Sequence, residues 1–269
     1  MDGREIRLKR LFGEGRAVII AMDHGLFDGP IQGMEDLPET ARRINPDVDA
    51  VLLAPGMMRH CCDLFAGSRR PLAAVRLNWN SVYCFGWGYS AASSVGAYGV
   101  LDALREGMDI PLVSLTLRTG DEERDARNVN VFAELTAEAH GLGLPVIGEY
   151  FPTGHPEMAP EELHENVMVG TRIAAELGAD AVKTFYTCDF AQVTGTCPVP
   201  VLGLGAEKRP TQADALELAA AEVRDGAGGV VFGRNAVQVP DPQAFQAALI
   251  DVVKKGEAVD DVIRKHQLE

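Results

Sequence analysis

Short apolar runs alternate with longer amphipathic stretches along most of the chain. The runs are rich in Val, Ile, Leu and Ala, a composition typical of strands buried on both faces of a parallel sheet. Eight segments have this character: residues 17–22, 50–54, 72–77, 111–115, 145–150, 179–185, 199–204 and 229–232. Eight strands that alternate with helices predict an α/β fold, the (β/α)8 or TIM barrel, formed by residues 1–269 as a single domain. A doubly wound sheet is the alternative.

The helix signals between these runs are clearest in the second half of the chain. Residues 160–177 place apolar or small side chains on one stripe, begin with a proline and are followed by a glycine, as helices often are. Residues 212–224 and 132–140 show similar patterns. The stretch 56–110 is rich in Gly, Ser, Tyr and Trp, and its helical signals are too weak to place.

Composition narrows the classes of function. The chain has 25 basic and 39 acidic side chains, a formal net charge of −14, which disfavours binding to the phosphates of nucleic acids. No apolar run approaches the roughly 18 residues that cross a bilayer, and the first residues lack the apolar core of a signal peptide, so we expect no membrane association. Five cysteines without CxxC spacing favour reduced thiols, and we expect a cytoplasmic protein.

Active sites of TIM barrels lie at the carboxyl ends of the strands, where one lysine stands out. Of six lysines, only Lys183 lies inside a predicted buried strand. Burying an ammonium group is costly unless it is paired or neutralised, and a neutral amine can attack a carbonyl carbon to form a Schiff base. Lys183 is therefore a candidate nucleophile. A structural ion pair is the alternative.

Three further residues at predicted strand ends are candidates for proton transfer. Asp23 follows the first apolar run and could pair with the lysine and move protons at the imine, or merely cap the next loop. Glu149 and Tyr150 end the fifth run, and only one of them should point into the barrel because neighbouring strand residues face opposite sides. Either is a candidate general acid or base, and the pattern does not decide between them.

The segments after the seventh and eighth strands are candidates for binding an anion. Gly205, Ala206 and Gly233 are small enough for backbone N–H groups to approach a phosphate, and Arg234 adds a cation. Phosphate is often bound at this place in TIM barrels, although glycines after strands also form simple turns. The six histidines show no metal-ligand spacing, so we expect no metal.

Three of these segments carry a resemblance to a known family. The sequences MDHG at 22–25, GADAVKTFY at 178–186 and GAGGVVFGRNAVQ at 226–238 resemble the DeoC/DhnA-type class I aldolases. That group includes archaeal-type fructose-bisphosphate aldolases, aminodideoxyheptulosonate synthases and autoinducer-2 phosphate thiolases. The resemblance runs in order from Arg10 to Gln246. It implies a (β/α)8 barrel, a homo-oligomer that is often a decamer, a Schiff-base lysine matching Lys183 and an active-site aspartate matching Asp23.

The chain departs from the family pattern at two places. The loop after the seventh strand commonly reads Ser-Gly-Gly-Pro-Lys in the family, whereas here it lacks the serine and contains Glu207, an acidic residue close to the expected phosphate. On the fifth strand, alignment on Pro152 puts Phe151 where archaeal-type aldolases have a tyrosine. An inward Glu149 would instead resemble the arrangement of tagatose-bisphosphate aldolases.

We therefore predict a class I aldolase, a carbon–carbon lyase that uses no metal or organic cofactor. Its substrate would be a small phosphorylated sugar or ketone, and its reaction most like that of fructose-bisphosphate aldolase. Two alternatives remain, a phosphosugar isomerase or epimerase on the same barrel and a non-catalytic barrel that binds sugar phosphates.

Overall fold

Eight parallel strands close into a barrel in the computed structural model of this protein, which describes residues 2–13, 15–67 and 70–268. The strands neighbour one another in the order β1-β10-β9-β8-β7-β6-β3-β2. Their bounds are Ala17–Ala21 for β1, Ala50–Leu53 for β2, Leu72–Arg76 for β3, Ile110–Leu115 for β6, Ile147–Tyr150 for β7, Ala181–Phe185 for β8, Val201–Leu204 for β9 and Gly229–Phe232 for β10. Each of the eight apolar runs supplies one of these strands, so the predicted TIM barrel is confirmed.

Alternate residues of each strand fill two separate cores. Inward side chains such as Ile19, Leu52 and Leu112 form a small cluster inside the barrel, and Leu11 of α1 (Gly3–Leu11) packs into it from the amino-terminal end. Outward neighbours such as Ile20 belong to a much larger core between strands and helices. Because both faces are buried, the strands are apolar throughout, which is why the sequence pattern revealed them.

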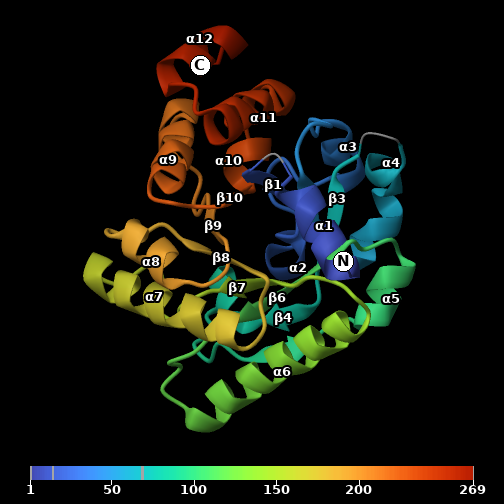
Figure 1. Ribbon diagram of the computed structural model, residues 1–269, viewed down its shortest axis with the longest axis vertical. Helices are drawn as coiled ribbons and strands as arrows, with labels where there is room; N and C mark the ends of the chain where they lie inside the picture. Colours follow the sequence, from blue (N-terminus) through green and yellow to red (C-terminus); the bar gives the residue numbers. More distant parts are fainter. Residues whose placement is uncertain (1, 14, 68–69, 269) are drawn as a thin grey trace.

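The helices surround the barrel (Figure 1). Those in the first half of the chain are α2 (Gly25–Asp28), α3 (Leu37–Arg42), η1 (Pro55–His60), α4 (Cys62–Phe65), α5 (Val100–Arg105) and α6 (Glu122–Gly141). The second half holds α7 (Pro160–Glu176), α8 (Phe190–Thr196), α9 (Gln212–Arg224), α10 (Arg234–Val237), α11 (Pro242–Ile250), η4 (Asp251–Lys255) and α12 (Val259–His266).

The three predicted helices agree with the structure to different extents. The expectations for 160–177 and 212–224 match α7 and α9, whereas 132–140 covers only the second half of α6. The charged first half of α6 begins at the cap residue Asp121, whose side chain accepts a hydrogen bond from the backbone N–H of Arg124.

A two-stranded hairpin that the sequence pattern missed lies between β3 and β6. It pairs β4 (Asn78–Asn80) with β5 (Ser94–Gly96), and its loop contains the short turns η2 (Ser81–Tyr83) and η3 (Phe85–Trp87). Buried amides hold the hairpin in place. The amide of Asn78 donates to the Ser94 hydroxyl and to the Ser114 carbonyl, both at 2.8 Å, and Asn128 of α6 donates to the Ala92 and Thr116 carbonyls at 2.9 Å.

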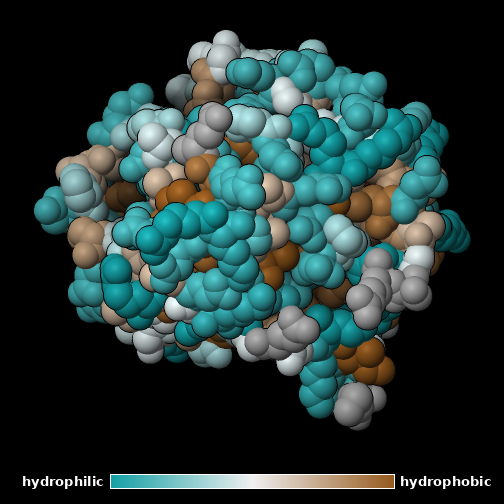
Figure 2. All heavy atoms as spheres, turned by 90° about the horizontal axis from the view of Figure 1, so that it is seen from above, coloured by the Kyte–Doolittle hydropathy of each residue, from teal (hydrophilic) through white to brown (hydrophobic). Residues whose placement is uncertain are grey.

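The surface is predominantly hydrophilic where Figure 2 shows it, and apolar side chains form separate small areas on that face. Among the described residues, no helix is long and apolar enough to span a membrane. All five cysteines are free thiols.

Candidate active site

Four ionisable side chains continue the inward side of their strands at the carboxyl end of the barrel. Each stands two residues after an inward residue of the barrel core, because side chains that point to one face recur at every second position. The four are Asp23 after β1, Arg76 at the end of β3, Glu149 on β7 and Lys183 on β8. They line one cavity of about 650 Å³.

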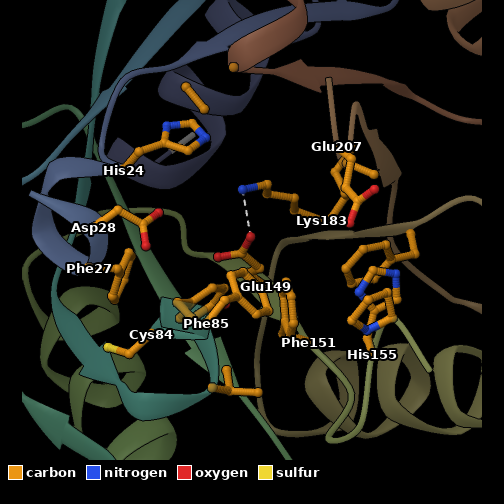
Figure 3. A pocket seen from close by; sticks show the side chains of 18 of the residues that line it. His24, Phe27, Asp28, Cys84, Phe85, Glu149, Phe151, His155, Lys183 and Glu207 are labelled. Carbon is orange, nitrogen blue, oxygen red and sulfur yellow. Dashed lines mark ion pairs between the residues drawn. The ribbon is translucent and has the colours of Figure 1, made fainter. Parts of the chain in front are cut away.

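These side chains form a continuous ionic chain (Figure 3). The Lys183 ammonium lies 2.5 Å from Oε1 of Glu149, and the other oxygen of Glu149 accepts a hydrogen bond from Arg76 Nη2. Arg76 Nε donates in turn to Oδ2 of Asp23 at 2.5 Å. No member is more than 7% exposed. Two cations alternate with two carboxylates, so the buried charges cancel.

The ionic chain keeps its two carboxyl groups ionised. Burial by itself raises the pKa of Asp23 and Glu149, but the positive charges of Arg76 and Lys183 outweigh burial and hold both pKa values below their ordinary range. Removing one partner of such a buried pair would leave an uncompensated charge, at a cost of about 3–5 kcal/mol. The four residues therefore depend on one another.

Sequence reasoning missed Arg76. Its guanidinium lies over the rings of Phe27 and Tyr83, 5.1 and 4.8 Å from their centroids, and contacts both carboxylates of the ionic chain. Arg76 lies inside the apolar run at residues 72–77, as Lys183 lies inside its own run. A charged residue inside an apolar run, the signal that singled out Lys183, would have found Arg76 as well.

Of the two candidates on β7, only Glu149 points into the cavity. The ring of Tyr150 lies on the outer side of the strand against α7, where a Cβ built on Gly170 would come within 2.2 Å of it. Burial raises the pKa of Tyr150 to about 12. Because strand alternation turns Tyr150 away from Lys183, the geometry favours Glu149 over Tyr150 as the acid or base.

His24 lies beside the ionic chain. It is half-buried, and desolvation lowers its pKa to about 4 in spite of the nearby Asp23 carboxylate, so the imidazole is neutral near pH 7. A Cβ on Gly233 would lie 2.3 Å from its Cε1 atom. The absence of a side chain at Gly233, directly after β10, therefore lets the backbone lie close to this histidine.

The predicted anion-binding residues gather on one side of the same cavity, which Gly205, Ala206, Gly233 and Arg234 all line. Arg234 Nη2 donates to the Ala206 carbonyl at 3.0 Å. Ala206 has φ +51°, a strained value for a residue other than glycine, and among the described residues no acceptor is bonded to its N–H. The backbone N–H of Ala206 and the guanidinium of Arg234 are thus near one another.

Side-chain hydrogen bonds fix the carbonyl groups of the loop after β9. The amide nitrogen of Asn235 donates to the carbonyls of Gly205 at 2.7 Å and Glu207 at 2.9 Å, and its oxygen accepts from the Arg209 N–H at 2.7 Å. Asn235 was not predicted as part of the site. It fixes the loop without lining the cavity itself.

The fold and the site together define a TIM-barrel enzyme with a buried lysine in an ionic chain at the carboxyl ends of its strands. Residues 17–239 match the family described as "DeoC/LacD family aldolase". The chain belongs to this family and is a carbon–carbon lyase.

Known relatives agree with this assignment. The chain is 31% identical to an uncharacterized aldolase of Saccharolobus solfataricus, over 98% of this chain and 99% of the relative. It is 30% identical to a 3-hydroxy-5-phosphonooxypentane-2,4-dione thiolase of Klebsiella pneumoniae, over 93% of this chain and 81% of that protein. It also resembles the structure of an archaeal fructose-1,6-bisphosphate aldolase whose catalytic lysine carries the carbinolamine intermediate, with TM-score 0.76, 26% identity and coverage of 93% and 98%.

Proposed function

We propose that this protein is a Schiff-base aldolase that cleaves and forms a carbon–carbon bond in a ketose phosphate. The observation that carries the proposal is the buried contact of 2.5 Å between Lys183 and Glu149 at the carboxyl end of the barrel. The similarity to an archaeal aldolase trapped with its catalytic lysine bound to substrate supports a covalent lysine here.

In this mechanism the Lys183 ammonium group first loses a proton to water, and the resulting amine attacks the ketone carbon of the substrate and forms a carbinolamine. Protonation of the carbinolamine hydroxyl and loss of water give a protonated imine, whose positive charge replaces that of the ammonium group beside Glu149. Removal of the proton from the C4 hydroxyl breaks the C3–C4 bond, and its electron pair moves to the imine nitrogen to give an enamine. The aldehyde leaves, the enamine is protonated at C3, and water hydrolyses the imine to release the ketone.

The ionic chain supplies the groups for these proton transfers. Glu149 contacts the Lys183 nitrogen and is ionised, so it can accept the proton of the C4 hydroxyl. Asp23 lies at the other end of the ionic chain but is close enough to Lys183 for their charges to interact. It assists proton movements at the imine. Arg76 positions both carboxylates, since it donates to each of them. Because the four charges cancel when the nitrogen of Lys183 is positive, the site is suited to a protonated imine.

A phosphate on the ketone half of the substrate would bind at the loops after β9 and β10. Arg234 and the backbone N–H of Ala206 are the groups that suit a dianion there. The phosphate would then lie on the side of the cavity formed by the loops after β9 and β10, and β9 neighbours β8, which carries Lys183.

Borohydride trapping tests the proposal. Incubation with dihydroxyacetone phosphate and borohydride should inactivate the enzyme and add one ligand mass to the peptide that contains Lys183. Lys183→Ala should abolish both trapping and cleavage. Lys208→Ala is the matched control, because Lys208 lies on an exposed loop after β9 and outside the cavity lining, so trapping should persist.

The same variants separate the alternatives. A phosphosugar isomerase would keep part of its activity in Lys183→Ala, and a non-catalytic barrel would bind the sugar phosphate as well as before. Full activity of Lys183→Ala, or a ligand mass on another lysine, would overturn the proposed mechanism.

A further inference from the structure

The cavity has an aromatic wall in addition to its ionic chain and its loops after β9 and β10. Its rings are in contact from one end to the other, with centroids 4.6 Å apart between the first and second and between the second and third, then 4.8 Å and 4.0 Å. In order they are Phe27, Tyr83, Phe151, Phe185 and His155, and Phe85 joins Phe151 from the hairpin loop at 6.0 Å.

The aromatic wall stands next to the reacting nitrogen. Phe185 follows Lys183 by two residues on β8, and Phe151 follows Glu149 by two residues after β7, so both rings form the layer directly above the ionic chain. Figure 3 shows Phe85, Phe151 and His155 on the side of the cavity opposite His24. An aldehyde that leaves Lys183 on this side would pass along the rings.

Acidic side chains lie near the aromatic wall. Glu207 and Glu157 both line the cavity, and the negative charge of each acts to raise the pKa of the His155 imidazole. Burial nevertheless lowers the pKa of His155, so it is neutral near pH 7. Apart from Arg76 and Lys183, which belong to the ionic chain, Arg234 is the one lysine or arginine among the described residues that line the cavity.

One phosphate can therefore be paired in this cavity, and a second cannot. The cation that lies against this wall is Arg76, over Phe27 and Tyr83. Its charge is already neutralised by Asp23 and Glu149. A phosphate at the aromatic wall would therefore lose water without gaining an unpaired cation, next to two carboxylates that repel it. An apolar chain or ring would instead replace water against aromatic carbon.

We propose that the aldehyde half of the substrate carries no charge and presents an apolar face to the aromatic wall. The inference rests on the proposed aldolase function and narrows its substrate class. The substrate is then a ketose monophosphate, with its phosphate at the loops after β9 and β10, in place of a bisphosphate.

The test is aldol addition by the full chain with dihydroxyacetone phosphate as donor. Two acceptors are compared, 3-phenylpropanal and glyceraldehyde 3-phosphate, with product formation followed by mass spectrometry. We expect kcat/KM for 3-phenylpropanal to exceed that for glyceraldehyde 3-phosphate by about tenfold or more. Apolar pockets discriminate by factors of this size between groups that fit and groups that do not. A preference for glyceraldehyde 3-phosphate would overturn the inference.

Two variants on the same turn give a matched pair. Phe85 and Trp87 both lie on η3 and are 54% and 59% exposed, but only Phe85 lines the cavity and contacts Phe151. Phe85→Ala should lower kcat/KM for 3-phenylpropanal by about fivefold to tenfold, in line with the loss of one aromatic contact. Trp87→Ala should leave it unchanged. Equal effects of the two variants, or none from Phe85→Ala, would contradict the proposed wall.

Borohydride trapping separates this inference from the proposed function. Absence of an adduct on Lys183 with dihydroxyacetone phosphate would reject the aldolase mechanism itself. An adduct that forms normally, with glyceraldehyde 3-phosphate preferred or with neither acceptor reacting, would reject only the apolar acceptor site.

Discussion

Glu149 stands between two cations, and its neighbour on the strand provides a control for its role. Glu149→Gln keeps the size of the side chain but removes the titrating group, so kcat for cleavage should fall by about 10²–10⁴. Imine formation uses Lys183, and borohydride trapping should persist. Tyr150→Phe should leave kcat nearly unchanged, because the Tyr150 hydroxyl lies outside the cavity. An inactive Tyr150→Phe beside an active Glu149→Gln would contradict the assignment.

Arg234 allows a separate test of the phosphate position. Arg234→Ala should raise KM for the phosphorylated donor by an amount equivalent to about 1.5–3 kcal/mol, the contribution of a charged hydrogen bond. Addition reactions with unphosphorylated dihydroxyacetone should change far less. Arg209→Ala is the control, since Arg209 follows the same loop but does not line the cavity. An unchanged KM for the phosphate ester would place the anion elsewhere.

At Gly170, α7 lies close against β7. A Cβ at this position of α7 would lie 2.2 Å from the ring of Tyr150, which is 1% exposed and has little room to move. Gly170→Ala should therefore lower the free energy of unfolding by about 1–3 kcal/mol, the usual cost of overpacking. In Gly195→Ala on α8, the new methyl meets nothing within 4 Å. That variant should be neutral or up to about 1 kcal/mol more stable in urea unfolding. Equal stability of the two variants would contradict this account.

The elements differ in how far the sequence predicts them. The barrel strands were predictable because both of their faces are buried, and inward alternation then carries Glu149 and Lys183 to one cavity. The hairpin of β4 and β5 was not predictable from the sequence. Its strands have three residues each and depend on buried hydrogen bonds from the side-chain amides of Asn78 and Asn128. Such contacts join residues far apart in sequence and leave no periodic pattern. The aromatic wall was missed for the same reason, since its rings come from elements and loops that lie far apart in the sequence.

Across the whole molecule, buried carboxyl groups give opposing dependences of stability on pH. The folded pKa values of Asp23 and Glu149 are lowered, so their contribution is present above the unfolded pKa, near 4, and is lost as pH falls through the folded values. Glu222 on α9 acts in the opposite sense. It is fully buried against Gly203, neither of its carboxyl oxygens has a hydrogen-bond partner among the described residues, and burial raises its pKa well above the ordinary range.

Because the folded pKa of Glu222 is raised, its carboxyl group destabilises the protein progressively as pH rises above the unfolded value of about 4.5. Glu222→Gln removes this titration. The free energy of unfolding of Glu222→Gln minus that of wild type should therefore increase between pH 5 and pH 8, by up to about 1.4 kcal/mol per pH unit. Urea unfolding at both pH values measures the change, with the exposed Glu217→Gln of the same helix as control. A difference between Glu222→Gln and wild type that stays constant with pH would show that Glu222 is already ionised in the folded protein.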